Sequence, residues 1–513
     1  MRPVFVSLEP PCNRACPAGE NIQGWLSYAQ SGDHERAWRL LTQDNPLPAC
    51  TGRVCYHPCE SRCNRIEIDA AVGIQCVERF LGDEAIRQQW SFTPPSAETG
   101  KRILVIGAGP AGLSAACHLR LAGHAVVIRE ASPKAGGLLR YGIPAYRLPR
   151  QRLDAEIARI TAMGVVLECN TRVNDIESAR RDGRFDAVFL AIGAGLAKRT
   201  AIPGAAAANV LDAVSVLRSL EQGEKPRLGR RIVAYGGGNS ALDVARSAKR
   251  LGAGDPVIVY RRNRAKMPAH DFEVEDALAE GVRVTWLSTI TQAGEGTITV
   301  EKMELDRNGF PQPTGAFETL DADTVILALG QDVDSSLPRS AGLALRNGAV
   351  PVGQDMMTAT DGVFAGGDMV AGERTATVAI GHGKKAARHI DAWLRGTRCE
   401  AAEPRQPARF DQMNSWYYAD AERSEPAMLP MQERQKTFGE VVQGVSEPTA
   451  IRESRRCLSC GNCFACDNCY GVCPDNAVTK RGIGLYEFDY DGCKGCGLCA
   501  QECPSGAIAM TSD

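Results

Sequence analysis

Arg102-Ile-Leu-Val-Ile-Gly-Ala-Gly-Pro-Ala-Gly112 is an apolar run that ends in three spaced glycines; a helical stretch and a second apolar run up to Glu130 follow. In a βαβ unit Gly107 permits the turn, Gly109 lets the backbone approach a pyrophosphate, and Gly112 allows the helix to pack closely. Glu130 stands where an acid binds ribose hydroxyls. The stretch predicts a dinucleotide site made by Gly107, Gly109, Pro110, Ala111, Gly112 and Glu130.

A second motif of the same kind begins at Arg231 and reads Gly236-Gly-Gly-Asn-Ser-Ala241 after its strand. The next strand ends in Arg261-Arg262, and arginine at this place can pair with a 2′-phosphate, which favours NADP over NAD. The alternative is an ordinary solvated basic face shared with Arg246, Lys249, Arg250, Arg264 and Lys266. The predicted contacts are Gly236, Gly238, Asn239, Ser240, Ala241, Arg261 and Arg262.

Two similar apolar segments, Asp186 to Gly193 and Asp323 to Gly330, bracket the second motif. We expect them where one nucleotide domain is inserted into the other. The fold class is α/β, with two nested Rossmann-like domains between a helical Fe–S domain and an α+β ferredoxin-like domain. The expected boundaries are 1–98 for the helical Fe–S domain, 99–228 with 324–395 for the first nucleotide domain, 229–323 for the second, 396–450 for a linker, and 451–513 for the ferredoxin domain.

The composition argues against a nucleic-acid-binding protein, a membrane-spanning protein and a disulfide-bonded secreted protein. The 513 residues carry 59 basic and 61 acidic side chains, so nothing indicates a nucleic-acid partner or a membrane surface. Neither a signal peptide nor an apolar run of about 20 residues is recognisable, which predicts no membrane span. The 20 cysteines cluster towards both ends, and clustered cysteines of a cytoplasmic protein more often bind metal than each other.

The C-terminal cysteines form two runs of Cys-x2-Cys-x2-Cys-x3-Cys-Pro. This spacing is typical of a ferredoxin with two [4Fe–4S] clusters, in which the fourth cysteine of each run ligates the other cluster; four-cysteine zinc is the competing interpretation. Cys457 and Cys460 extend the first run as spare thiols, an alternate ligand set or part of a further site. The predicted ligands are Cys463, Cys466, Cys469, Cys473, Cys493, Cys496, Cys499 and Cys503.

The chain resembles the small subunit of glutamate synthase and the N-terminal half of dihydropyrimidine dehydrogenase. The resemblance rests on the nested motifs, the stretches 136–149 and 260–269, and Gly366-Gly-Asp368. It implies FAD in the first site, NAD(P)H in the second, and a helix after Thr375 that points its N-terminus at the flavin. His382 on that helix is interpreted as a packing residue, because the flavin carries the chemistry. Further implied contacts are Gly137, Leu138, Arg147, Gly193, Gly330, Gly367, Asp368, Thr377 and Val378.

The resemblance also bears on the N-terminal cysteines, whose thiolate-only set suits iron–sulfur clusters or zinc. It implies one cluster on Cys16, Cys55 and Cys59 with Glu78, and a second on Cys12 and Cys63. The family's two further cysteines would fall at about Val4 and Ser7, so the second cluster is either absent or completed by Cys50 and Cys76. The metal set therefore includes Cys12, Cys16, Cys50, Cys55, Cys59, Cys63 and Glu78.

These features predict a flavoprotein that moves electrons between NAD(P)(H), FAD and ferredoxin-type clusters for a partner catalytic subunit. A 2-oxoacid oxidoreductase is the favoured partner, because such clusters often have low potential; free ferredoxin is a further candidate. The alternatives are a glutamate synthase small subunit and a non-catalytic regulatory module that binds zinc and nucleotide.

Overall fold

The computed structural model describes residues 1–400, 403–482 and 485–512. The expected linker and ferredoxin domain include residues 401–402, 483–484 and 513, which lie outside the described residues. The chain forms two compact units, Met1–Phe92 with Gly396–Ala427 and Gly444–Asp513, and Thr93–Arg395 with Met428–Gln443. None of its described helices is long and apolar enough to cross a membrane.

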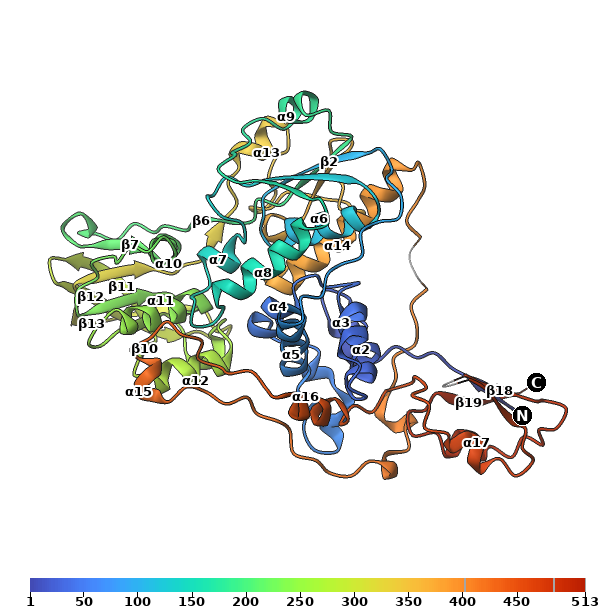
Figure 1. Cartoon of the computed structure of the whole chain (residues 1–513). Helices are drawn as coiled ribbons and strands as arrows, with labels where there is room; N and C mark the ends of the chain where they lie inside the picture. Colours follow the sequence, from blue (N-terminus) through green and yellow to red (C-terminus); the bar gives the residue numbers. More distant parts are fainter. Residues whose placement is uncertain (401–402, 483–484, 513) are drawn as a thin grey trace. The chain divides into compact units, whose positions relative to one another are not determined.

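A five-stranded parallel sheet of order β16-β5-β2-β3-β4 forms the first nucleotide domain. Two of its helices, α6 and α14, lie side by side (Figure 1), and the Ser114 hydroxyl of α6 donates to the Ile380 carbonyl of α14. The elements are β2 (Arg102–Ile106), α6 (Pro110–Leu121), β3 (Ala125–Arg129), α7 (Leu138–Tyr141), α8 (Arg150–Thr161), β4 (Val166–Glu168), α9 (Ile176–Asp182), β5 (Ala187–Leu190), α13 (Ser336–Ser340), β16 (Val363–Ala365) and α14 (Ala376–Leu394).

A second parallel sheet, β10-β9-β8-β14-β7, forms the other nucleotide domain. Helices α10 to α12 pack on one face and the antiparallel sheet β11-β12-β13 on the other. The elements are β7 (Val210–Asp212), α10 (Ala213–Glu221), β8 (Ile232–Tyr235), α11 (Asn239–Arg250), β9 (Val257–Tyr260), α12 (Asp271–Ala279), β10 (Arg283–Trp286), β11 (Ser288–Gly294), β12 (Thr297–Leu305), β13 (Pro311–Asp321) and β14 (Thr324–Leu327).

The sheet pairing corrects the expected boundaries of the nested domains. Strands β7 and β14 were expected in the first domain, but β14 pairs with both β8 and β7 and so belongs to the second sheet. The chain passes between the domains at a short antiparallel pair, β6 (Leu196–Ala197) and β15 (Gln331–Asp332). The two nested α/β domains themselves are confirmed.

The N-terminal part of the first unit is helical. Helices α4 and α5 pack at close range because glycines lie at their contact: a Cβ on Gly52 would meet Arg79 Cα at 2.5 Å, and one on Gly82 would meet Ala49 N at 2.3 Å. Trp25, Trp38 and Leu41 are fully buried between the helices. These are α1 (Pro11–Ala15), α2 (Ile22–Ala29), α3 (His34–Leu41), α4 (Pro48–Val54) and α5 (Ile74–Arg87).

The C-terminal part of the same unit is a small α+β domain to which the N-terminal strand adds. Strand β1 (Arg2–Phe5) pairs antiparallel with β19 (Ile508–Thr511), and Val4 faces Ala509 in this register. The first position at which the family would supply a further cysteine is therefore part of a β-ladder. The other elements are α16 (Glu447–Ser454), α17 (Asn468–Val472), β17 (Val478–Gly482), β18 (Leu485–Phe488) and α18 (Leu498–Gln501).

The stretch 396–450, expected as a linker, makes specific contacts. In the second unit Arg250 Nε donates to the Thr437 carbonyl at 3.0 Å, and Val441 N donates to the Tyr146 carbonyl at 2.9 Å. Helix α15 (Met431–Arg434) lies just before Thr437 and Val441 in the sequence. Bonds of this kind from side chains far away in sequence hold a segment that has little periodicity of its own.

Candidate functional site: two nucleotide cradles and three groups of cysteines

The first cradle lies between β2 and α6. Gly107 has φ +106°, and a Cβ there would meet the Ala191 carbonyl at 2.4 Å; one on Gly112 would meet the Gly107 carbonyl at 2.0 Å. Gly109 differs, because its backbone is extended and a Cβ would meet only Gly137 Cα, at 3.9 Å. The space over Gly109 is therefore open, as a pyrophosphate would require.

The walls of this cradle come from neighbouring segments. Glu130 follows β3, and its carboxylate accepts hydrogen bonds from Ala108 N at 2.8 Å and Ser132 N at 2.7 Å. Gly136 N donates to the Ala108 carbonyl, so Gly137 and Leu138 at the start of α7 lie beside the glycine turn. Pro110 and Ala111 form the first turn of α6.

The far end of the same domain is built on the turn Gly366-Gly-Asp368 and on α14. Gly367 has φ +74°, and its N–H donates to His382 Nδ1 at 3.2 Å. His382 thus fixes the turn that presents Asp368, which is consistent with a packing role. Burial raises the pKa of Asp368 to about 6.

The N-terminus of α14 has a polar atom available for a ligand. Thr375 caps the helix by accepting from Val378 N, and the buried Thr377 hydroxyl has no hydrogen-bond partner among the described residues. A helix N-terminus favours negative charge, and an unpaired buried hydroxyl favours a polar ligand group. Both properties fit the flavin expected here.

The second cradle repeats the first between β8 and α11. Gly236 has φ +145°, and a Cβ there would meet the Ala328 carbonyl at 2.2 Å, whereas a Cβ on Gly238 would meet nothing within 4 Å. Ala241 is fully buried and Gly252 ends the helix with φ +96°. The Asn239 side chain accepts from His270 N, and the Ser240 hydroxyl accepts from Gln331 Nε2.

Arg261 and Arg262 follow β9, and among the described residues neither forms an ion pair. The Nε of Arg262 is buried without a hydrogen-bond partner in the described part of the chain. Three other arginines of the basic face form ion pairs with carboxylates: Arg246 and Arg250 are buried against Glu280, and Arg264 pairs with Glu275. The pair is thus distinct from the basic face considered as its alternative.

We expect the double variant Arg261→Ala/Arg262→Ala to raise the KM for NADPH about 10- to 100-fold and to change the KM for NADH little. Charge-assisted hydrogen bonds to a 2′-phosphate contribute about 1.5–3 kcal/mol, and NADH has no such phosphate. Steady-state kinetics with both cofactors measure the effect, with Arg264→Ala as the matched control. Equal increases for both cofactors would contradict the assignment.

Three further residues predicted to contact a cofactor lie near the junction of the two nucleotide domains. Gly193 and Gly330 both have positive φ, +68° and +100°, next to the crossing between the nucleotide domains. Arg147 was expected at the cofactor, but its guanidinium pairs with Asp243 at 2.9 Å and with Glu273, both from the second domain. These two ion pairs link the nucleotide domains, and a contact of Arg147 with the cofactor stays a prediction.

In the helical part, Cys16, Cys55 and Cys59 form one group close to Glu78. Cys59 lies within electrostatic reach of Cys55, Cys16 and Glu78, and burial raises the pKa of Cys59 well above its usual range. Glu78 is buried and accepts a hydrogen bond from Asn45 at 3.1 Å. The same amide donates to Glu20, a buried carboxylate near Cys16. Glu20 was not predicted from the sequence, because it belongs to no cysteine run.

Cys12 and Cys63 form a second group, and Cys457 and Cys460 join it. All four line one cavity. Neither Cys50 nor Cys76, the expected substitutes, is among the described residues that line this cavity. Cys50 is fully buried in α4, and Cys76 Sγ donates to the carbonyl of Gly73, the residue that precedes α5.

The ferredoxin-type cysteines form two crossed groups. Cys463, Cys466, Cys469 and Cys503 line a second cavity, and burial raises the pKa of Cys469 to about 12. Cys499 lies within electrostatic reach of Cys493, Cys496 and Cys473. In each group three cysteines of one run meet the fourth of the other, as the spacing predicts.

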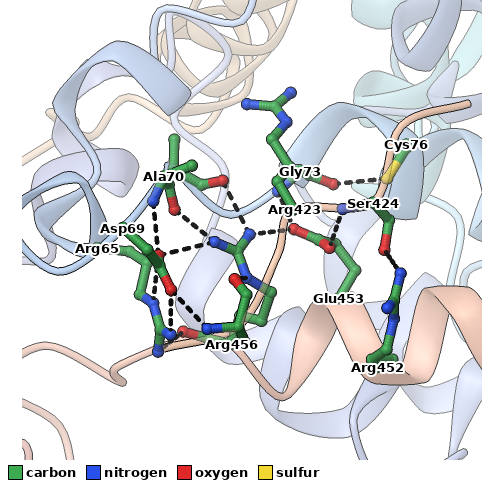
Figure 2. Close-up of polar contacts among 12 residues, drawn as sticks. Arg65, Asp69, Ala70, Gly73, Cys76, Arg423, Ser424, Arg452, Glu453 and Arg456 are labelled. Carbon is green, nitrogen blue, oxygen red and sulfur yellow. Dashed lines mark hydrogen bonds and ion pairs between the residues drawn. The ribbon is translucent and has the colours of Figure 1, made fainter. Parts of the chain in front are cut away.

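A buried network fixes Arg456 against the N-terminal helices (Figure 2). Its guanidinium donates to Glu453 Oε1 at 2.6 Å, Asp69 Oδ1 at 2.9 Å and the carbonyls of Ala70 and Ala71. Arg65 shares Asp69, and its guanidinium holds the pKa of that carboxyl far below the usual range. Glu453 also accepts from Gly73 N and Ser424 N. The network joins segments about residues 65–73, 421–424 and 453–456.

We expect Arg456→Ala to destabilise this junction by about 3–5 kcal/mol, because it leaves the buried Glu453 carboxylate without its cation, whereas Asp69 keeps its ion pair with Arg65. Opening of segment 421–456 should become about 100-fold or more frequent. Limited proteolysis under conditions of fast reclosing measures this population. Arg455→Ala, which removes an exposed side chain one position earlier, is the matched control and should be cut at the wild-type rate.

Comparison with known proteins is consistent with this geometry. Residues 101–383 match the model of the pyridine nucleotide-disulphide oxidoreductase family. Residues 6–90 match dihydropyrimidine dehydrogenase domain II with its 4Fe-4S cluster, and residues 462–507 match the 4Fe-4S dicluster domain. These models establish an FAD- and NAD(P)-binding part flanked by 4Fe–4S domains.

Similar proteins include the β subunit of the NADP(+)-dependent formate dehydrogenase of Moorella thermoacetica, 36% identical over 88% of this chain and 70% of that protein. The small chain of the NADPH glutamate synthase of Escherichia coli is 32% identical over 75% of this chain and 89% of its own length. Among solved structures, FprA of Mycobacterium tuberculosis has a TM-score of 0.50 at 17% identity, covering 69% of this chain and 99% of that one. This last likeness concerns the fold.

Proposed function

Because the chain belongs to the pyridine nucleotide-disulphide oxidoreductase family and carries 4Fe–4S domains, we propose that it is the NADP-linked electron-transfer subunit of a larger redox enzyme. One observation carries the proposal: a single chain combines two open nucleotide cradles with crossed groups of four cysteines. Several relatives are named as subunits of larger enzymes, among them the β subunit of an NADPH-Fe(3+) oxidoreductase of Geobacter sulfurreducens.

In this proposal FAD supplies the link between the two-electron chemistry of NADPH and the one-electron chemistry of clusters. The residues of the chain bind and orient. Gly109 and Glu130 hold the pyrophosphate and ribose of FAD, and Asp368, fixed through His382, contacts the ribityl chain. The N-terminus of α14 favours negative charge on the ring. Gly238 holds the pyrophosphate of NADPH, while Arg261 and Arg262 select its 2′-phosphate.

The cluster ligands follow from the groups of cysteines. We assign Cys463, Cys466, Cys469 and Cys503 to one cluster, and Cys493, Cys496, Cys499 and Cys473 to another. Cys16, Cys55 and Cys59 supply three ligands to a cluster in the helical domain, with the Glu78 carboxylate as the fourth. All 20 cysteines lie in the described residues and are free thiols, which suits the reducing cytoplasm proposed for this protein.

For the partner we propose a 2-oxoacid oxidoreductase, because a two-cluster ferredoxin domain suits low-potential electrons. A formate-oxidising partner is the second candidate, and it is favoured by the 36% identity to the formate dehydrogenase β subunit. A glutamate synthase large subunit has weaker support, since the alignment to the small chain covers 75% of this chain. The regulatory zinc module is set aside, because all three matched models describe redox domains.

The test is to purify the native complex without oxygen and supply NADP+ with pyruvate and coenzyme A or with formate, or NADPH with glutamine and 2-oxoglutarate. Formation of NADPH that requires the 2-oxoacid supports the first partner, and formation that requires formate supports the second. Identification of the co-purifying subunits by mass spectrometry provides the independent check. A chain that purifies alone and contains neither flavin nor iron would contradict the whole proposal.

A further inference from the structure

Cys457 and Cys460 are not accounted for by either cluster domain. The helical Fe–S match ends at residue 90 and the dicluster match begins at residue 462. Yet both cysteines are packed inside the fold: Cys460 is buried, and Cys457 packs against the core of the N-terminal helices. Two half-sets of cysteines therefore meet, one from each end of the sequence.

We propose that Cys12, Cys63, Cys457 and Cys460 together hold one [4Fe–4S] cluster. This ligand set goes beyond the proposed function, since it concerns a cofactor site and not the partner or the substrate. The four side chains line a single cavity, which also contains the apolar side chains of Leu26, Val72, Ile74 and Leu458. A pocket with four thiols and otherwise mainly apolar walls suits a cluster, whose ligands are thiolates and whose potential depends on limited solvent access.

The same chain contains a second cysteine-lined cavity with which this one can be compared. The cavity lined by Cys463, Cys466, Cys469 and Cys503 lies in the matched dicluster domain, and it is of similar size to the cavity at Cys12. In the described residues no set of three or more His, Cys, Asp or Glu side chains is placed to hold a single metal ion. Thiolates around one zinc, each about 2.3 Å from it, would lie closer together than thiolates on the corners of a cubane.

The backbone around Cys457 and Cys460 repeats that of the ferredoxin loops. In the loop starting at Cys463, the left-handed residues are Ala465 and Asp467, with φ +62° and +66°; in the loop starting at Cys493 they are Gly495 and Gly497, with φ +68° and +81°. The loop starting at Cys457 has Ser459 and Gly461 at the same two places, with φ +52° and +68°.

Left-handed backbone is costly for alanine, aspartate and serine, and such strain persists at functional sites. Three loops of one chain share the left-handed conformation at equivalent positions, two of them with non-glycine residues there, and two of the three are cluster-binding loops by their family match. The third loop is therefore shaped as a cluster-binding loop.

Hydrogen bonds to the sulfurs support the same conclusion. Ser459 N donates to Cys457 Sγ at 3.4 Å, and the Asn64 amide lies 3.5 Å from Cys460 Sγ. Donors of this kind stabilise sulfur that carries negative charge. In the ferredoxin domain Ala477 N donates to Cys473 Sγ at 3.2 Å in the same manner.

Two buried cations flank the set in the sequence. Arg456 precedes Cys457 and Arg65 follows Cys63 by two residues, and both are almost fully buried in the network of Figure 2. That network fixes the position of Cys457 against the N-terminal helices, where it lines one cavity with the other three thiols. The new set also explains why Val4 can lie in the β1–β19 ladder: its place as a ligand is taken by a cysteine from the other end of the chain.

The test is iron and acid-labile sulfide analysis of the full chain, prepared without oxygen and normalised to FAD. The double variant Cys457→Ser/Cys460→Ser should lose about four iron and about four sulfide per chain. Cys12→Ser/Cys63→Ser should lose the same amount. The quadruple variant should lose about four iron, not about eight, because both pairs serve one cluster. Cys76→Ala, a buried thiol outside the cavity, is the matched control and should keep all iron.

Misfolding of this compact unit would also remove the iron of the ferredoxin domain, which belongs to the same unit, so a loss of about four iron and no more distinguishes loss of this cluster from folding failure. Single variants Cys460→Ser and Cys12→Ser give a second readout, because a hydroxyl can replace one thiolate: each should alter the same electron paramagnetic resonance signal of the reduced protein. Unchanged iron in the double variants, additive loss of about eight iron in the quadruple variant, or loss of zinc in place of iron would each overturn the assignment. These outcomes do not depend on the identity of the partner enzyme.

Discussion

Valine at position 109 is expected to abolish FAD binding while the surrounding fold stays intact. Gly109 has extended backbone, which valine adopts readily, and an added Cβ would contact only Gly137 Cα at 3.9 Å in the structure. The branched side chain would then fill the space that a pyrophosphate needs. We expect FAD affinity to fall about 100-fold or more, or about 2.7 kcal/mol. Absorbance of the released flavin and the rate of NADPH-dependent quinone reduction measure the loss.

The second cradle provides the matched variant. Gly238→Val places the same side chain in the equivalent position, where nothing lies within 4 Å, and should raise the KM for NADPH about 100-fold while FAD remains bound. Gly254→Ala, at an exposed turn away from both cradles, should change neither property. Gly112→Ala is the contrasting case, because its Cβ would lie 2.0 Å from the Gly107 carbonyl and should destabilise the domain itself. Full FAD content in Gly109→Val would contradict the assignment of this cradle.

The nested nucleotide domains could be predicted from sequence because each local signal agrees with the global fold. Gly107 and Gly236 both have left-handed backbone directly after a buried strand, and only a few motifs contain that combination. The boundaries were less predictable. Strand β14 is as apolar as β5, and a fully buried strand gives no sign of which sheet it joins. Its pairing with β7 and β8 depends on the tertiary structure and is not encoded in the strand's own sequence.

The cysteine groups show the same limit more sharply. Spacing within a run predicts which of its cysteines share a loop, and the crossed ferredoxin groups follow from it. No spacing relates Cys12 and Cys63 to Cys457, because the contact depends on Arg456, Asp69 and Glu453, charged residues that look like ordinary surface residues in the sequence. Arg147 is a similar case, since a basic residue in a cofactor-like stretch proved to pair with carboxylates of the other nucleotide domain.

The crossed cysteine groups give the other large effect that we expect. Cys503→Ser should disrupt the cluster held by the run that starts at Cys463, although Cys503 itself belongs to the run that starts at Cys493. The reason is geometric: Cys503 lines the cavity of Cys463, Cys466 and Cys469, whereas Cys473 lies near Cys499. Electron transfer from NADPH to the partner subunit should fall more than about tenfold, because a relay is broken, while NADPH-dependent quinone reduction at the flavin should continue.

Alkylation with iodoacetamide followed by mass spectrometry shows which thiols the substitution exposes. In Cys503→Ser, Cys463, Cys466 and Cys469 should become alkylated while Cys493, Cys496 and Cys499 stay protected; Cys473→Ser should give the reverse pattern and is the matched control. If each variant instead exposes the cysteines of its own run, the groups are not crossed. Because each variant removes one thiol from the same small domain, a general loss of folding would expose both runs in both variants and is thereby distinguished from the loss of one cluster.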